Sequence, residues 1–139
     1  MSKPVLCLDF DGVIHSYESG WHGADVIPDR PVPGAVDFIL RAQEHFCVAI
    51  FSSRSHQTNG ISSMQSWLLG RAQEAWVHRE GILAELGPFS EVLKRLAQIE
   101  WPTEKPPAFL SIDDRALTFN GNWADFDLEE LKRFKPWNK

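Results

Sequence analysis

With 139 residues, the chain has room for one domain around a single core, and its 43% hydrophobic and 24% charged residues are typical of a globular protein rather than a disordered or fibrous one. A formal net charge of -5 argues against a large sequence-independent nucleic-acid surface, which needs clustered Lys and Arg. We expect a cytoplasmic protein without a membrane segment, because no secretory leader or transmembrane-length run is seen and Cys7 and Cys47 lie in apolar runs typical of buried thiols.

The first half of the chain predicts a strand, a loop, a helix and a second strand. Residues 5–10 are almost continuously apolar, which is typical of a strand covered on both faces of a parallel sheet, and Gly12 permits a turn after it. Residues 15–33 contain two glycines and three prolines without a sustained period, which predicts an ordered loop or small flap. Apolar residues at helical spacing follow Gly34 and lead into a second buried strand at 46–51.

The second half predicts further helices and another strand. Residues 61–68 have the apolar spacing of an amphipathic helix. Residues 70–100 are harder to interpret, and we expect helices at about 71–85 and 89–96, with a short strand near 96–101. A turn at 102–107 precedes the apolar run AFLSI at 108–112, which predicts a strand, and DLEELKRF from Asp127 predicts a capped C-terminal helix. The order of elements indicates an α/β fold in one domain, residues 1–139.

Polar side chains follow three of the predicted strands. They are Asp9 and Asp11, then Ser52 and Ser53, then Asp113 and Asp114. In an open parallel sheet, the carboxyl ends of the strands form the ligand-binding edge, so these groups are expected to converge. Up to four carboxylates would repel one another unless a divalent cation lay between them, and Mg²⁺ suits a small set of oxygen ligands.

Such a cation would leave one carboxylate free to attack phosphorus. Asp9 is the better candidate for the nucleophile because it comes first after the strand. Asp11, two residues further along an extended chain, would project from the same side and act as general acid and base. A phosphate also needs donors, and the hydroxyl of Ser52 and the ammonium of Lys105 lie next to strand ends in the sequence.

The segments LDFDGVI, FSSRS and SIDDRA, together with Lys105, resemble the four motifs of the haloacid dehalogenase-like (HAD) superfamily of phosphohydrolases. The resemblance spans residues 5 to about 118 and implies a three-layer, Rossmann-like parallel sheet with helices on both faces. It implies that Asp9 is the nucleophile, Asp11 the acid and base, and Ser52 and Lys105 the phosphate ligands. It also implies a magnesium site formed by Asp9, Asp11, Asp113 and Asp114, with the main-chain carbonyl of Asp11 facing the metal.

Each of these residues also has an ordinary structural explanation. Asp9 and Asp11 can form a turn before glycine, Ser52 can cap a helix, and Lys105 can be a solvated loop residue. Arg54 is placed to reach a substrate and Trp21 to stack on a base, although packing explains a tryptophan equally well. The histidines at positions 15, 22, 56 and 78 lack metal-ligand spacing, and we interpret them as surface or loop residues.

The short gaps between motifs leave no room for a full cap domain and indicate a capless or minimally capped form, with residues 15–33 as a flap. An open site suits a phosphate on a large substrate or a site closed by another subunit of a homo-oligomer. Three hypotheses remain: a phosphomonoesterase acting on a nucleotide or nucleic-acid end, a phosphatase of a small phosphorylated metabolite, and a phosphoryl-binding module without turnover. The first rests on the similarity of the short layout to phosphatase domains of polynucleotide end-processing enzymes.

Overall fold

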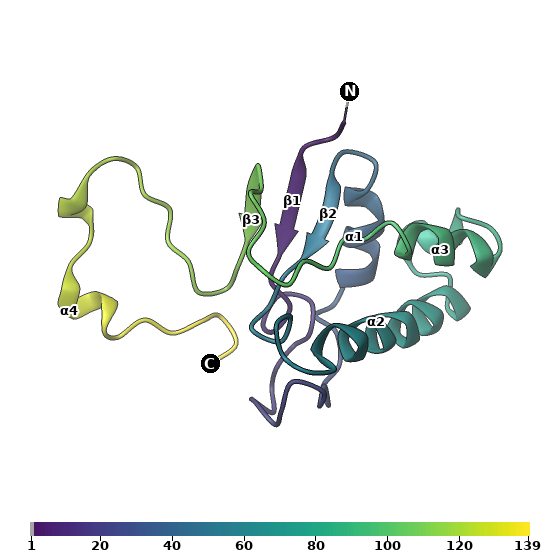
Figure 1. Ribbon diagram of the computed structural model, residues 1–139, viewed down its shortest axis with the longest axis horizontal. Coiled ribbons are helices and arrows are strands. Elements are labelled where there is room, and N and C mark those ends of the chain that lie inside the picture. The colour runs from purple at the N-terminus through teal and green to yellow at the C-terminus, as the bar shows by residue number, and fades with distance from the viewer. Residues whose placement is uncertain (1) are drawn as a thin grey trace.

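A three-stranded parallel sheet lies at the centre of the fold, in the order β2-β1-β3 (Figure 1). The computed structural model describes residues 2–139. Its strands are β1 (Val5–Leu8), β2 (Cys47–Ile50) and β3 (Leu110–Ile112). Its helices are α1 (Ala35–Ala42), α2 (Gly60–Val77), α3 (Phe89–Leu96) and α4 (Leu128–Leu131), with short 3₁₀ helices η1 (Gly81–Ala84) and η2 (Trp123–Asp125).

The predicted α/β organisation is confirmed, with shorter elements than the sequence suggests. The helix expected over 71–85 is the end of α2 followed by η1, and the expected helix at 89–96 is α3. The strand expected near 96–101 is reduced to one parallel bridge between Glu100 and Ala49, beside the outer edge of β2. The C-terminal helix is a single turn, capped by Asp127, whose carboxylate accepts from the Glu129 N–H at 2.9 Å. No helix among residues 2–139 has the length and hydrophobicity needed to cross a bilayer.

The core explains why β1 and β2 read as continuous apolar runs. Leu6, Leu8, Val48 and Ile50 are buried, and they join side chains from α1, α2, η1 and α3 in one cluster. The three residues of β3 are instead exposed, although the run 108–112 is equally apolar. The sheet is therefore well covered around β1 and β2 and poorly covered at β3.

The strand register brings the ends of β1 and β3 together. Leu8 pairs with Ile50 on one side and with Ile112 on the other. The ladder continues one step further, where the Asp9 N–H donates to the Ile112 carbonyl at 3.0 Å. Asp9 is thus level with the residue that follows β3, Asp113.

The C-terminal segment leaves the sheet and then returns to it. After β3 the chain projects away from the helices and carries η2 and α4 (Figure 1). Its last residues then reach the loop after β1, where Trp137 Nε1 donates to the Gly12 carbonyl at 2.7 Å and Asn138 Nδ2 donates to the Ser16 carbonyl at 2.8 Å. Both ends of this excursion therefore lie beside the loop that carries Asp9 and Asp11.

Candidate functional site

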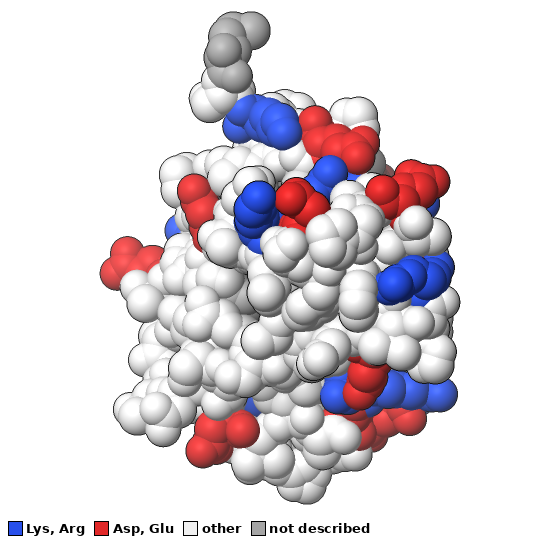
Figure 2. Space-filling model, turned by 90° about the vertical axis from the view of Figure 1, so that its right-hand side faces the viewer, with Lys and Arg blue, Asp and Glu red and all other residues white. Residues whose placement is uncertain are grey.

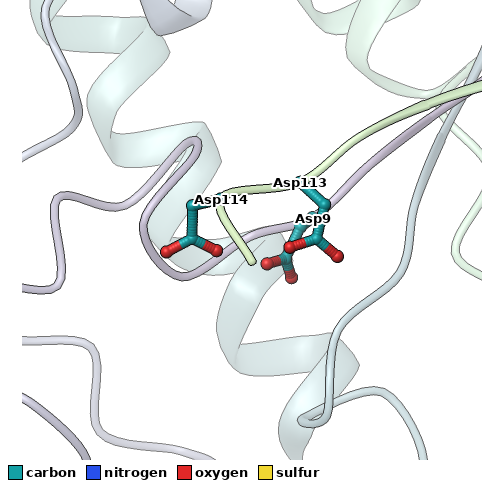
Figure 3. Close-up of side chains that lie close together, drawn as sticks. All are labelled: Asp9, Asp113 and Asp114. Carbon is teal, nitrogen blue, oxygen red and sulfur yellow. The ribbon is translucent and has the colours of Figure 1, made fainter. Parts of the chain in front are cut away.

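Three of the predicted carboxylates meet at the carboxyl edge of the sheet. Asp9, Asp113 and Asp114 each offer an oxygen within 4.8 Å of the others. All three carboxylates point in the same direction from the ends of β1 and β3 (Figure 3). Asp9 and Asp114 are half-buried, whereas Asp113 is exposed. The cluster is thus partly desolvated and remains open to solvent on one side.

Local backbone contacts hold these side chains in place. Asp9 Oδ1 accepts from the Phe10 N–H at 2.8 Å, and Asp113 Oδ1 accepts from the Arg115 N–H at 2.8 Å. Gly12 turns the chain at φ +82°, and a Cβ at this position would overlap the Asp114 carboxylate. Glycine at position 12 therefore serves both the turn and the close approach of Asp114.

The carboxylates strongly perturb one another. Burial raises the pKa of Asp9 to about 7, with further increases from the charges of Asp113 and Asp114, while the Phe10 N–H opposes the shift. Burial also raises the pKa of Asp114, against a hydrogen bond with Asp9. Without a cation, the cluster thus retains a proton near neutral pH that isolated carboxyl groups would have released.

This donor set fits a hard divalent cation. Asp9 and Asp114, whose pKa values are raised, gain most from a cation that replaces the proton, and a set of three carboxylates suits Mg²⁺, Ca²⁺ and Mn²⁺. Asp9, Asp113 and Asp114 would hold the ion. The donors specify the class of ion and do not single out magnesium.

Asp11 differs from the sequence-based expectation. The chain turns directly after β1, where the N–H groups of Val13, Ile14 and His15 all donate to the Phe10 carbonyl. The Asp11 side chain therefore does not project beside Asp9, and its carboxylate is absent from the cluster of Asp9, Asp113 and Asp114. The Asp11 carboxylate forms a bidentate ion pair with Arg54, whose Nε donates to Oδ2 at 2.9 Å and whose Nη2 donates to Oδ1 at 3.1 Å.

His15 completes the surroundings of Asp11. It is fully buried, which corrects its interpretation as a surface or loop histidine. The Asp29 N–H donates to His15 Nε2 at 3.1 Å, which leaves Nδ1 to donate to Asp11 Oδ1 at 2.9 Å. Although burial alone would raise it, the pKa of Asp11 is lowered by the hydrogen bonds from His15 and Arg54 and by the charge of Arg54. Asp11 is therefore held as an anion.

Arg54 joins Asp11 to the flap. Its guanidinium is fully buried, and Nη1 donates to the carbonyls of Gly23, Ala24 and Val26 at 2.9, 3.0 and 3.1 Å. The Trp21 ring lies against the guanidinium at 4.7 Å. In this arrangement the donors of Arg54 are directed at protein acceptors, and one face of the Trp21 ring packs on Arg54 while the side chain stays 44% exposed.

The two predicted phosphate ligands lie in different environments. Ser52 is buried just after β2, and its Oγ accepts from the Arg54 N–H at 3.1 Å, so the side chain stabilises the turn before α2 rather than capping that helix. Lys105 is exposed in the segment before β3. Burial raises the pKa of the Cys7 thiol on β1, and the charge of Lys105 opposes this shift. Among residues 2–139, no ion pair links Lys105 to the carboxylate cluster.

Sequence reasoning missed the structural role of His15 and the number of acceptors bound by Arg54. The spacing of Asp11 and His15, four residues apart around a glycine turn, was the available signal.

A cavity of about 550 Å³ between α1 and α2 is lined by residues including Val36, Arg71 and Leu83 and contains none of the predicted site residues.

Comparisons with known proteins find no matching family model, curated protein or solved structure.

Replacing Arg54 by Met should destabilise the protein by about 3–5 kcal/mol, because it leaves the Asp11 carboxylate without its charged partner and three flap carbonyls without their donor. Urea denaturation measures this change in the free energy of unfolding. The exposed Arg30, which pairs with Glu18, provides the matched control, and Arg30→Met should cost less than about 1 kcal/mol. Equal losses in the two variants would contradict the structural role of Arg54.

The raised pKa of Asp9 predicts an unusual dependence of stability on pH in metal-free protein. The folded state retains its proton up to about pH 7, whereas an unfolded Asp releases it near 3.9. Between these values the folded state binds more protons, so the free energy of unfolding should fall by about 2–4 kcal/mol from pH 5 to pH 8.

Denaturation with chelator at both pH values tests this expectation, and Asp9→Asn should show less than half of the decrease. Mg²⁺ added at pH 8 should recover stability in the wild type, because it binds the folded state preferentially. An unchanged pH dependence in Asp9→Asn would show that the proton is held elsewhere.

Proposed function

We propose that the chain is a phosphomonoesterase that depends on a divalent cation, Mg²⁺ being the simplest choice, and acts through a covalent phosphate on Asp9. The observation that carries the proposal is the position of Asp9: its carboxylate follows a buried strand and lies within 4.8 Å of Asp113 and Asp114. Carboxylates held in this way are suited to attack phosphorus once a cation neutralises the site.

The resemblance of LDFDGVI, FSSRS and SIDDRA to HAD motifs supports the same assignment. We propose that the small parallel sheet is a reduced form of the three-layer HAD-like fold. The strand order is compatible with this, because β1, which precedes the first motif, lies between β2 and β3, which precede the second and fourth. The free thiols Cys7 and Cys47 are compatible with the cytoplasm.

In the proposed reaction, one oxygen of Asp9 attacks the phosphorus, the bond to the leaving oxygen breaks, and the leaving oxygen takes a proton from solvent water or from a protonated Asp11. A bound cation would neutralise negative charge on the phosphoryl group and on the three carboxylates. Asp113 and Asp114 would hold that cation, and burial of Asp9 would limit competing solvation of the nucleophile. Water then attacks the phosphate carried by Asp9, which releases inorganic phosphate and restores the carboxylate.

Asp11 could take part in the second half of this reaction only after its carboxylate turns from Arg54 and His15 toward Asp9. Its lowered pKa keeps it ionised, and an ionised carboxylate accepts the proton of the attacking water. Donating a proton to the leaving oxygen would require Asp11 to be protonated and separated from Arg54 and His15. Ser52 and Lys105 remain the proposed phosphate donors, and both would have to reorient toward the phosphate, since Ser52 is bound in its turn and Lys105 is exposed.

The open side of the cluster favours a phosphate at the end of a larger molecule. Asp113 is exposed, so a terminal phosphate can approach without a cap being opened. We propose a nucleotide or nucleic-acid end as substrate and a small phosphorylated metabolite as the alternative. On the face shown in Figure 2, which is the α2 and α3 side of the molecule, basic and acidic side chains are mixed and neither forms a continuous patch. The net charge of -5 likewise favours recognition of the terminal phosphate over binding along a long nucleic-acid backbone.

A specific observation also favours the hypothesis of a binding module without turnover. Two Arg54 nitrogens and His15 already bind the Asp11 carboxylate, which lowers its capacity as an acid. A protein locked in this state would bind a cation and a phosphate at Asp9, Asp113 and Asp114 without releasing product.

Hydrolysis of an aryl phosphate and of a 3′-phosphorylated oligonucleotide, each with Mg²⁺ and with chelator, tests the proposal. We expect turnover that requires the cation and falls by at least about 10³-fold in Asp9→Asn, because the nucleophile is lost. Glu91→Gln, at an exposed position on α3, is the control and should retain wild-type turnover.

Full activity in Asp9→Asn would overturn the assignment of the nucleophile. Mg²⁺ binding that is lost in Asp113→Asn, without hydrolysis of any phosphate ester, would favour the binding module. The ratio of kcat/KM for the two substrates separates action on nucleic-acid ends from action on small molecules.

A further inference from the structure

The sheet exposes an apolar strip beside β3. Leu110 and Ile112 pair in register with Leu6 and Leu8, so they extend the same face of the sheet beyond the part that α1 covers. With Phe38 of α1 they form a surface that we call the β3 strip, whose three side chains are 37–52% exposed. A groove of about 260 Å³ runs along it, lined in part by Leu8, Phe38 and Ile112. In the described residues, no strand pairs with the outer edge of β3.

The same chain carries an apolar segment that its own sheet does not cover. We call residues 115–135 the C-terminal arm, which projects from the β3 side of the molecule (Figure 1). Its exposed large apolar side chains are Leu117, Phe119, Trp123, Leu128, Leu131 and Phe134. Trp123 and Leu128 are 77% and 75% exposed. Phe119 and Trp123 contact each other, with ring centroids 4.4 Å apart.

We propose that the protein forms a two-fold symmetric dimer in which the C-terminal arm of each copy packs on the β3 strip of the other. Both complementary surfaces belong to one chain, so a two-fold axis covers both strips and both arms at once. The interface would also protect the unpaired edge of β3, which is otherwise a template for uncontrolled strand pairing.

The area of exposed apolar surface supports a second copy of the chain as the partner. The strip and the arm together supply nine large apolar side chains, three and six respectively, each at least 37% exposed. If each side chain buries on the order of 80–100 Å², one copy would bury about 800 Å², which matches the area that each partner buries in a standard stable interface.

The charge of the arm also favours a protein partner over a membrane or a nucleic acid. Residues 115–135 contain four basic residues and four acidic residues. This balance gives no net attraction to an anionic lipid surface or to phosphate backbones. A second copy needs no such attraction, because apolar burial drives association.

Sedimentation velocity of the full chain at about 1–100 µM tests the proposal, and we expect a dimer. Leu110→Asp in the strip and Trp123→Asp in the arm should each raise the dimer dissociation constant by at least about 30-fold, because each buries a charge in both halves of the interface. Val77→Asp, a matched change at an exposed position of α2 outside both surfaces, should leave the dimer intact. Circular dichroism checks that each variant is folded.

Mixing the two disrupting variants distinguishes arm exchange from other dimers. A mixed pair contains one wild-type strip facing one wild-type arm, so it should dimerise more tightly than either variant alone. A wild-type monomer at about 100 µM would overturn the proposal. So would a dimer that survives both substitutions, or a mixture that remains as monomeric as its components. None of these outcomes depends on phosphatase activity.

Discussion

The ion pair between Arg54 and Asp11 connects the parts of this small fold that lie around the site. One buried guanidinium binds the carboxylate after β1 and three carbonyls of the flap, and it also supports Trp21. A buried pair of this kind stabilises a structure only when the remaining donors and acceptors are satisfied, and here His15 and the flap satisfy them. The loop of residues 15–33 can therefore be ordered without regular secondary structure.

Asp9 lies two residues from Asp11, but its pKa is shifted in the opposite direction. Arg54 and His15 compensate Asp11 within the protein, so its pKa falls, whereas Asp9 faces two further carboxylates and its pKa rises to about 7. The fold therefore neutralises Asp11 and leaves the carboxylates at the open edge of the sheet without a basic partner. This asymmetry assigns different chemical capacities to the two aspartates: one has high affinity for a proton or cation, and the other is a fixed anion.

The positions of β1, β2 and β3 could be predicted from the apolar runs of the sequence, unlike the strand expected near 96–101, which is a single bridge. The meeting of Asp9 with Asp113 and Asp114 could be predicted because the ends of neighbouring parallel strands share one edge. The orientation of Asp11 could not, since it depends on a turn in which three N–H groups share the Phe10 carbonyl. The burial of Arg54 could not be predicted either, because three of its acceptors are backbone carbonyls some 30 residues away. Every residue has a backbone carbonyl, so the sequence does not indicate which of them will accept a hydrogen bond. Exposure of β3 was equally hidden, because an apolar run has the same composition whether or not something covers it.

The chain after β3 runs from the exposed edge of the sheet through the C-terminal arm and back to the loop that follows β1. The C-terminal arm begins next to Asp114, and the chain beyond it ends with Trp137 bound to the Gly12 carbonyl. Gly12 in turn has no side chain because Asp114 occupies that space. The arm is thus joined to the surroundings of the site at both of its ends, by the backbone that follows Asp114 and by the hydrogen bonds that Trp137 and Asn138 donate to the carbonyls of Gly12 and Ser16.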